Sequence, residues 1–274
     1  MQQFQELYNS KLTTPDGAVS RCLHSGAVCA SDIALAHSSL FYEAVGRAIA
    51  EGRLDDITQH TLLDTGAFPF YRPEFAGKYH GVSWFSQGPA RKAINGGFAD
   101  VMPAYYRDIP GLFQDYVKPE VLIAVVSPMD KHGYFSTGCD GSLSAALFAT
   151  AKTVLLEVNP HMPRSLSSTQ IHISQVDALW ENDAPMMCLP PKEIDEVSAR
   201  IGGFIAEEIP DGATLQLGIG AIPDAVGNAL QSKHHLGIHT EMFTDSMMTL
   251  IECGAVTNQR KTLHKGKSVT TLAY

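Results

Sequence analysis

Apolar positions along the chain recur at two spacings, which predict alternating helices and strands. Residues 35–50 carry apolar side chains at helical spacing and end at a glutamate and a glycine, a helix stop. Residues 121–126 form a continuous apolar run of strand length, and residues 154–158 form the next such run. Further helices are predicted over residues 89–94 and 142–151. Strands with helices between them favour a mostly parallel sheet covered on both faces.

A proline-rich break at residues 184–191 interrupts this pattern, because neither a helix nor a strand tolerates it well. We therefore place a domain boundary there, with one domain over residues 1–187 and a second over residues 188–274. The second part carries a shorter set of predicted elements, which reads as a βαβ-like beginning without its remainder. They are helix 194–205, strand 214–217, a helix to residue 230, strand 236–239, helix 247–252 and a terminal strand over residues 268–274.

The composition narrows the function classes. A net charge of −9 and a charged content of 18% argue against a nucleic-acid binder or a protein of anionic membrane surfaces. The five scattered cysteines form no CxxC pair and read as reduced thiols of a cytoplasmic protein. No leader pattern is visible at the N-terminus, and no apolar run reaches the roughly 18 residues of a membrane span. The terminal strand has no closing helix after it, so the chain is expected to be a fragment of something longer.

The stretch TLQLGIGAIP over residues 214–223 carries the strongest chemical signal. A short buried strand leads into Gly218 and Gly220, where a ligand can approach bare backbone N–H groups. Ile222 and Pro223 then open a helix, with proline at the first helical position. A strand, a glycine turn and a helix N-terminus together form an anion site, and Glu241 returns to it about two dozen residues later.

Two interpretations of this layout remain open from the residues alone. In the first, Gly218-x-Gly220 with the later Glu241 forms a dinucleotide site of an oxidoreductase, although Pro223 occupies the third glycine position. In the second, Glu241 is a nucleophile that attacks a thioester carbonyl. The exposed amides of residues 218–221 then stabilise the oxyanion or hold the cofactor.

The residues around Glu241 resemble a known family. The string LGIHTEMFTDS over residues 236–246 is similar to the LGIHTEMFSDG signature of family I coenzyme A transferases. The branch is the acetyl-CoA hydrolase/transferase group, which includes the 4-hydroxybutyrate and butyrate CoA-transferases. Further similar strings cover nearly the whole chain. They are GPARKA at residues 88–93, PMDKHGYFS at 128–136, EVNPHMPR at 157–164, and IHIS with VD between residues 171 and 177.

The resemblance implies two related open α/β domains with the active site between them, the second domain being incomplete here. It implies that Glu241 is catalytic and becomes a glutamyl-CoA thioester. It also implies that coenzyme A is contacted by a cofactor-binding loop of Gly218, Ile219, Gly220, Ala221 and Ile222. The chain departs from the family pattern at Ser246, where the family has glycine, so the backbone there is more restricted.

The resemblance implies CoA transfer between an acyl-CoA and a short carboxylate of the acetate, butyrate or 4-hydroxybutyrate type. It implies no metal and no redox cofactor, no nucleic acid or membrane partner, and a homo-oligomer in the cytoplasm. Acyl-CoA hydrolysis on the same scaffold remains an alternative, as does a non-catalytic CoA-binding remnant. The family's later glycine-rich segment is absent after residue 274, so activity of this chain alone is uncertain.

Overall fold

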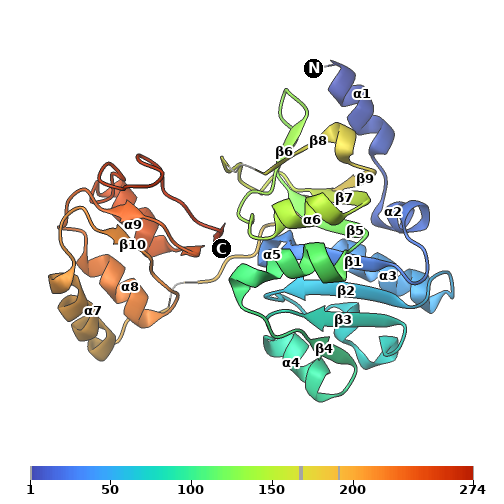
Figure 1. The fold of residues 1–274 in the computed structure, drawn as a ribbon, viewed down its shortest axis with the longest axis horizontal. Coiled ribbons are helices and arrows are strands. Elements are labelled where there is room, and N and C mark those ends of the chain that lie inside the picture. Colours follow the sequence, from blue (N-terminus) through green and yellow to red (C-terminus); the bar gives the residue numbers. More distant parts are fainter. Residues whose placement is uncertain (1, 167–168, 191, 274) are drawn as a thin grey trace. The chain divides into compact units, whose positions relative to one another are not determined.

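The computed structural model describes residues 2–166, 169–190 and 192–273 (Figure 1). It divides into two compact units, one up to Met186 and one from Met187 onward. Pro191, within the predicted break, and Tyr274, at the end of the predicted terminal strand, lie outside the described residues. Within the described part, no helix is both long and apolar enough to cross a membrane.

The first unit is built on a parallel seven-stranded sheet in the order β4-β3-β2-β1-β5-β7-β9. Strands β6 and β8 form a separate antiparallel pair. The strands are β1 Val28–Ile33, β2 Ile57–Leu62, β3 Tyr79–Ser83, β4 Ala99–Val101, β5 Val121–Val126, β6 Tyr134–Ser136, β7 Thr153–Val158, β8 Gln170–His172 and β9 Ala178–Glu181. The helices are α1 Gln2–Lys11, α2 Pro15–Cys22, α3 Ser39–Ala50, α4 Gly88–Asn95, α5 Ile109–Leu112 and α6 Ser144–Thr150.

Alternate residues of the central strands point into two separate apolar clusters, as a period of two requires. Ile123 of β5 and Leu155 of β7 belong to a cluster that also contains residues of α2, α3 and α4. Their neighbours Ala124 and Leu156 belong to a second cluster with Tyr8 of α1. Both faces of the sheet are therefore covered, and the α/β class predicted from the sequence is confirmed.

Local capping explains where helix α3 begins and ends. The hydroxyl of Ser38 accepts a hydrogen bond from the Phe41 N–H at 3.2 Å, which starts the helix at Ser39 rather than at the predicted residue 35. The helix ends at Ala50, before Gly52 with φ of +72°. Apolar residues on one stripe, including Val45 and Ile49, are buried against the sheet.

The second unit holds helices α7 Glu196–Glu208, α8 Ala221–Ala229 and α9 Asp245–Glu252, and strands β10 Thr214–Leu215, β11 Gly237–Ile238, β12 Met242–Phe243 and β13 Leu272–Ala273. β10 pairs in parallel with β11, and β12 pairs in parallel with β13. Isolated parallel bridges join Leu236 to Val256 and His239 to Val269. One extended segment, residues 236–243, therefore has parallel neighbours on both sides.

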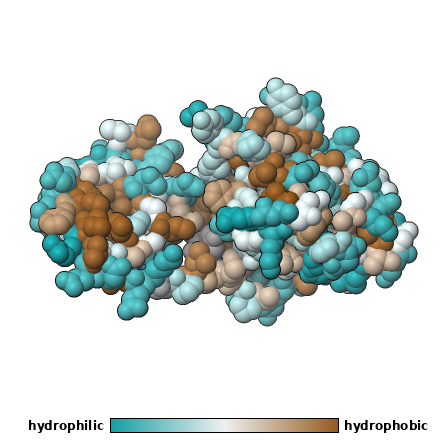
Figure 2. Space-filling view, turned by 90° about the horizontal axis from the view of Figure 1, so that it is seen from below, coloured by the Kyte–Doolittle hydropathy of each residue, from teal (hydrophilic) through white to brown (hydrophobic). Residues whose placement is uncertain are grey.

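The predicted elements of this unit are present, but the strands are shorter than predicted. The apolar run at residues 214–217 pairs over only its first two positions, because the chain then turns toward α8. Hydrophobic side chains also gather on the surface of this unit where α7 lies (Figure 2). Val197 and Phe204 on that helix are 66% and 62% exposed, so α7 is apolar on its outer side as well as on its inner side.

Candidate active site

Strand register brings Glu241 to the glycine turn. Thr214 pairs with Gly237 and Leu215 with Ile238, so each residue of β10 lies beside the residue 23 positions later, which is also the separation of Gly218 and Glu241. The His239 N–H donates to the Leu215 carbonyl at 3.0 Å, which continues the pairing past β11. The Thr240 hydroxyl then lies 3.3 Å from the Leu217 carbonyl oxygen and 3.0 Å from the Met242 carbonyl oxygen, and the two share its one proton. The residues immediately before Gly218 and Glu241 are therefore joined, at the carboxyl ends of two parallel strands, where open α/β sheets bind ligands.

The glycine turn itself has a conformation that side chains disfavour. Gly220 has φ of +126° and ψ of 176°, a region that is essentially restricted to glycine, and it is the N-cap of α8. The first backbone bond of the helix runs from the Asp224 N–H to the Gly220 carbonyl at 3.1 Å. The N–H groups of Ala221 and Ile222 precede that ladder and point out of the helix end. This is the arrangement of backbone donors that favours an anion.

The prediction that Pro223 takes the first helical position is wrong. The helix begins at Ala221, so Pro223 is its third residue. The sequence could not distinguish these positions, because the first four N–H groups of any helix lack an intrahelical acceptor and proline loses nothing at any of them.

The predicted loop residues all reach the surface of the unit. Ile219 and Ile222 are 59% and 41% exposed, which is high for isoleucine. A Cβ atom on Gly218 would lie 3.9 Å from the Pro223 Cγ, an ordinary contact, and a Cβ on Gly220 would meet nothing within 4 Å. The turn therefore leaves open space above its backbone, which a ligand can use.

The Glu241 side chain is exposed, whereas its backbone is held. Its carbonyl oxygen accepts hydrogen bonds from the Thr271 and Leu272 N–H groups, both at 3.1 Å. In the described part of the chain, no hydrogen bond or ion pair to the Glu241 carboxylate is present. An exposed carboxylate of this kind can act as a nucleophile, and backbone N–H groups that reach the reacting carbonyl can stabilise the resulting oxyanion.

Buried carboxyl groups gather in the first unit, where no site was predicted. Asp32, near the end of β1, accepts from the Leu143 N–H at 3.0 Å and from the Ser144 hydroxyl at 2.5 Å. Asp140, after β6, accepts in return from the Ala36 N–H at 2.8 Å. Burial raises the pKa of both carboxyls, and the charge of Asp32 raises the pKa of Asp140 further. Each carboxyl group thus holds the backbone of a segment that lies more than 100 residues away in sequence.

This cluster lies where the strand order of the sheet reverses, between β1 and β5. Several polar atoms near it are buried without a hydrogen-bond partner among the described residues. They are both ring nitrogens of His37, Oδ1 of Asp64 and Asp140, and the hydroxyls of Thr137 and Ser142. Burial lowers the pKa of His37, so its ring is neutral, while Asp64 opposes that shift. Unpartnered buried groups of this kind are satisfied by ordered water or by a polar ligand.

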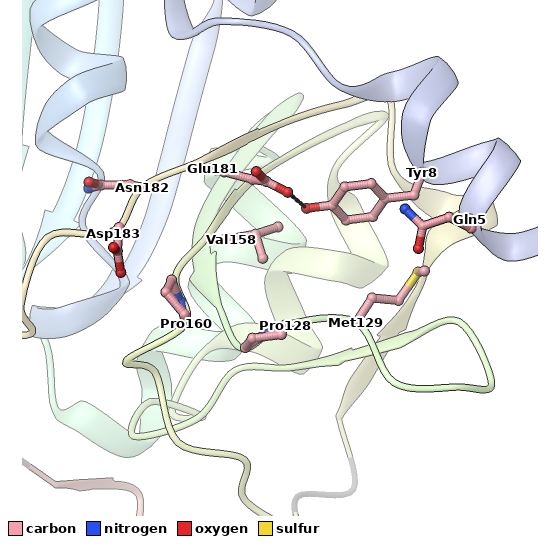
Figure 3. A pocket seen from close by; sticks show the side chains of 9 residues that line it. All are labelled: Gln5, Tyr8, Pro128, Met129, Val158, Pro160, Glu181, Asn182 and Asp183. Atoms are coloured by element: carbon pink, nitrogen blue, oxygen red, sulfur yellow. Dashed lines mark hydrogen bonds between the residues drawn. The ribbon is translucent and has the colours of Figure 1, made fainter. Parts of the chain in front are cut away.

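A cavity of about 630 Å³ also lies in the first unit, beneath α1 (Figure 3). Tyr8 donates to Glu181 at 2.7 Å on its wall, and Asp183 lies at its other side. Burial first, then Glu181, raises the pKa of the Tyr8 phenol, so the phenol stays protonated. The lining residues include these two carboxylates and no lysine or arginine. Because carboxylates repel phosphates and carboxylates, this cavity does not suit an acyl-CoA or a short acid.

Comparison with known proteins adds to this geometry. The model of the acetyl-CoA hydrolase/transferase N-terminal domain matches residues 1–190. A succinyl-CoA:cyclohexane-1-carboxylate CoA transferase of Geobacter metallireducens is 36% identical, over 98% of this chain and 61% of that protein. A 4-hydroxybutyrate coenzyme A transferase of Clostridium kluyveri is 35% identical, over 98% of this chain and 62% of that protein.

Solved structures show the same likeness. The crystal structure of RipA from Yersinia pestis has a TM-score of 0.93 and 33% identity, over 98% of this chain and 65% of that chain. A 4-hydroxybutyrate CoA-transferase structure from Porphyromonas gingivalis has a TM-score of 0.85 at 33% identity, over 99% and 64%. The chain thus spans slightly less than two thirds of the length of these proteins.

Proposed function

The chain belongs to the acetyl-CoA hydrolase/transferase family, and from this premise we propose that it carries the nucleophile for CoA transfer between an acyl-CoA and a short-chain carboxylate. The nucleophile is Glu241, and the turn of residues 218–222 contacts coenzyme A. The carrying observation is the parallel pairing of β10 with β11, because the glycine turn follows β10 and the exposed Glu241 follows β11 at the same end of the two strands. The relatives named for CoA transfer support the reaction class.

The chemistry follows a ping-pong course. A carboxylate oxygen of Glu241 attacks the thioester carbonyl carbon, and the C–S bond breaks to release CoA thiolate and an acyl-glutamyl anhydride. The thiolate attacks the glutamyl carbonyl carbon, which expels the donor's carboxylate and leaves a glutamyl-CoA thioester. An incoming carboxylate then reverses both steps and regenerates the Glu241 carboxylate. Each tetrahedral intermediate carries an oxyanion, and in this proposal the N–H groups at the start of α8, directly after the glycine turn, stabilise it.

A short carboxylate such as butyrate or acetate fits this scheme as either the departing or the incoming acid. Each acid forms and breaks its bond at the same glutamyl carbonyl through its own carboxylate group. Transfer without a metal or redox group conserves the thioester energy through covalent steps. Family membership gives no support to the dinucleotide interpretation. In the proposed reaction Glu241 is the nucleophile and not a ribose ligand.

Mass spectrometry after brief incubation with butyryl-CoA tests the proposal. We expect a glutamyl-CoA adduct on the peptide that contains Glu241, absent in Glu241→Gln. Glu252→Gln, which changes another exposed glutamate of the same unit, is the matched control and keeps the adduct. Formation of the adduct releases one equivalent of butyrate per chain, so continued release of butyrate beyond that equivalent without an acceptor indicates hydrolysis on the same nucleophile. CoA binding without an adduct in the wild-type chain contradicts the catalytic role and supports a binding remnant.

A further inference from the structure

The carbonyl oxygen of Glu241 receives more donors than a carbonyl normally accepts. Besides two backbone N–H groups, the hydroxyls of Thr270 and Thr271 donate to it at 3.0 and 2.6 Å. A carbonyl oxygen offers two lone pairs, so these four donors share it, and the one proton of the Thr270 hydroxyl is also shared with the Leu272 carbonyl at 2.9 Å. The backbone on the carboxyl side of Glu241 is therefore held by a concentrated set of contacts from the segment 270–272.

A second set of contacts holds the strand three residues before Glu241. The Asn258 side-chain oxygen accepts from the Ile238 N–H at 2.9 Å. The Lys261 ammonium donates to the Ile238 carbonyl at 2.6 Å, and the Val269 N–H donates to the same oxygen at 3.2 Å. Each backbone group of Ile238 thus has a side-chain partner, and only its carbonyl has a backbone partner as well, which is unusual inside a sheet, where backbone groups normally pair with each other.

Burial of the Lys261 ammonium at this place costs free energy, because a charge is removed from water. Lys261 is only 5% exposed, and its ammonium donates to two carbonyls, of Ile238 and Lys267, rather than to a carboxylate. Burial lowers the pKa of this ammonium, which is the sign of a charge taken from water. A Cβ on Gly237 would lie 2.6 Å from the Lys261 Cγ, so the glycine leaves room for the lysine stem.

We propose that Asn258, Lys261, Thr270 and Thr271 are positioning residues for Glu241, an inference that rests on the proposed role of Glu241 as nucleophile. The four side chains fix the backbone on both sides of residue 241. Among the described residues, no side chain bonds the Glu241 carboxylate directly, so its aim depends on this backbone. A misplacement of about 1 Å at a reacting atom can lower a rate by roughly 100-fold.

Thr271 offers the sharpest test, because its hydroxyl contacts only the Glu241 carbonyl. Thr271→Val keeps the shape and removes the donor, while Thr271→Ser keeps the donor. Thr262→Val, an exposed threonine of the preceding loop, is the matched control. The rate of adduct formation on Glu241 from butyryl-CoA is measured over a range of butyryl-CoA concentrations, together with the midpoint of thermal unfolding.

We expect Thr271→Val to slow the maximal rate of adduct formation by roughly 10- to 100-fold. The half-saturating concentration of butyryl-CoA and the unfolding midpoint stay near their wild-type values. Thr271→Ser recovers the rate, and Thr262→Val does not change it. A purely structural role is indicated, and the inference is overturned, if the valine variant loses midpoint and rate together or if the serine variant does not recover.

The two hypotheses fail in different ways. If the wild-type chain forms no adduct, the proposed function fails and the inference falls with it. If the wild-type chain forms the adduct and Thr271→Val forms it equally fast, the positioning role alone is wrong.

Discussion

Replacing Gly218 with alanine distinguishes a glycine needed by a ligand from a glycine needed by the fold. Gly220, two residues later, has φ of +126°, and alanine there costs about 1–3 kcal/mol of backbone strain. Gly218 has no such conformation, and its new methyl group would lie 3.9 Å from the Pro223 Cγ. Alanine at 218 should therefore leave the free energy of unfolding unchanged or raise it by about 0.4–1 kcal/mol, since it restricts the unfolded chain.

CoA binding by the Gly218→Ala protein should weaken, although its stability does not fall. If CoA approaches the bare backbone at residue 218, the methyl group occupies that space and costs about 1–3 kcal/mol, as overpacking does. The Kd for CoA then rises roughly 5- to 150-fold, because about 1.4 kcal/mol corresponds to a factor of ten. Urea unfolding measures the stability, and titration calorimetry with CoA measures the Kd.

Two results would refute this reasoning. An unchanged Kd in a folded Gly218→Ala protein would show that no ligand approaches that backbone. A loss of stability as large as that of Gly220→Ala would show that the fold, rather than a ligand, requires glycine at both positions. A lowered unfolding midpoint for Gly220→Ala, measured in parallel, confirms that the assay detects strain in this turn.

Two further predictions concern stability. Gly202→Ala places a methyl group 2.7 Å from the Ala225 carbonyl carbon and should lower the free energy of unfolding in urea by about 1–3 kcal/mol. Gly203→Ala is the control, because a Cβ there meets nothing within 4 Å and should not destabilise the fold. Equal effects of the two substitutions would contradict the packing of α7 on α8. Burial raises the pKa of Asp140, so the folded chain binds this proton more tightly than the unfolded chain, and the free energy of unfolding falls as pH rises from about 4 through that raised pKa. Asp140→Asn should make this decline shallower in urea unfolding followed across pH, and an unchanged slope would contradict the shift.

The parts of the fold that were predictable are those with a local signal. The apolar run at residues 121–126 is strand β5, and the helix predicted over residues 89–94 is α4 within one residue at each end. Strand β1 has no such signal, because it buries Asp32 beside apolar residues. Its polar side chain is bonded to residues more than 100 positions away, and no local pattern contains that information.

The candidate site divides in the same way. Gly218 and Glu241 lie 23 residues apart, joined by one helix and one strand, and that short unit was readable from the sequence. The contacts of Thr270 and Thr271 with the Glu241 carbonyl were not readable, since hydroxyl bonds to backbone leave no periodic pattern. Site residues that lie close together in sequence can thus be predicted from it. The side chains that hold their backbone in place are visible only in the structure.

The serine at 246 shows how a departure from a family pattern is absorbed. Ser246 lies in the first turn of α9, where helical dihedrals suit any residue, so serine strains nothing there. A Cβ on Gly227 of α8 would lie 2.6 Å from the Ser246 Cβ, so the glycine at 227 makes the space that serine needs. The Ser246 hydroxyl also bonds the Thr244 hydroxyl at 3.0 Å. Burial and the charge of Asp245 raise the pKa of Asp224, and a hydrogen bond from Ser246 opposes that shift. Ser246 of α9 therefore packs against α8, the helix that begins at the glycine turn. Serine in place of the family's glycine is thus accommodated in the unit that contains Glu241.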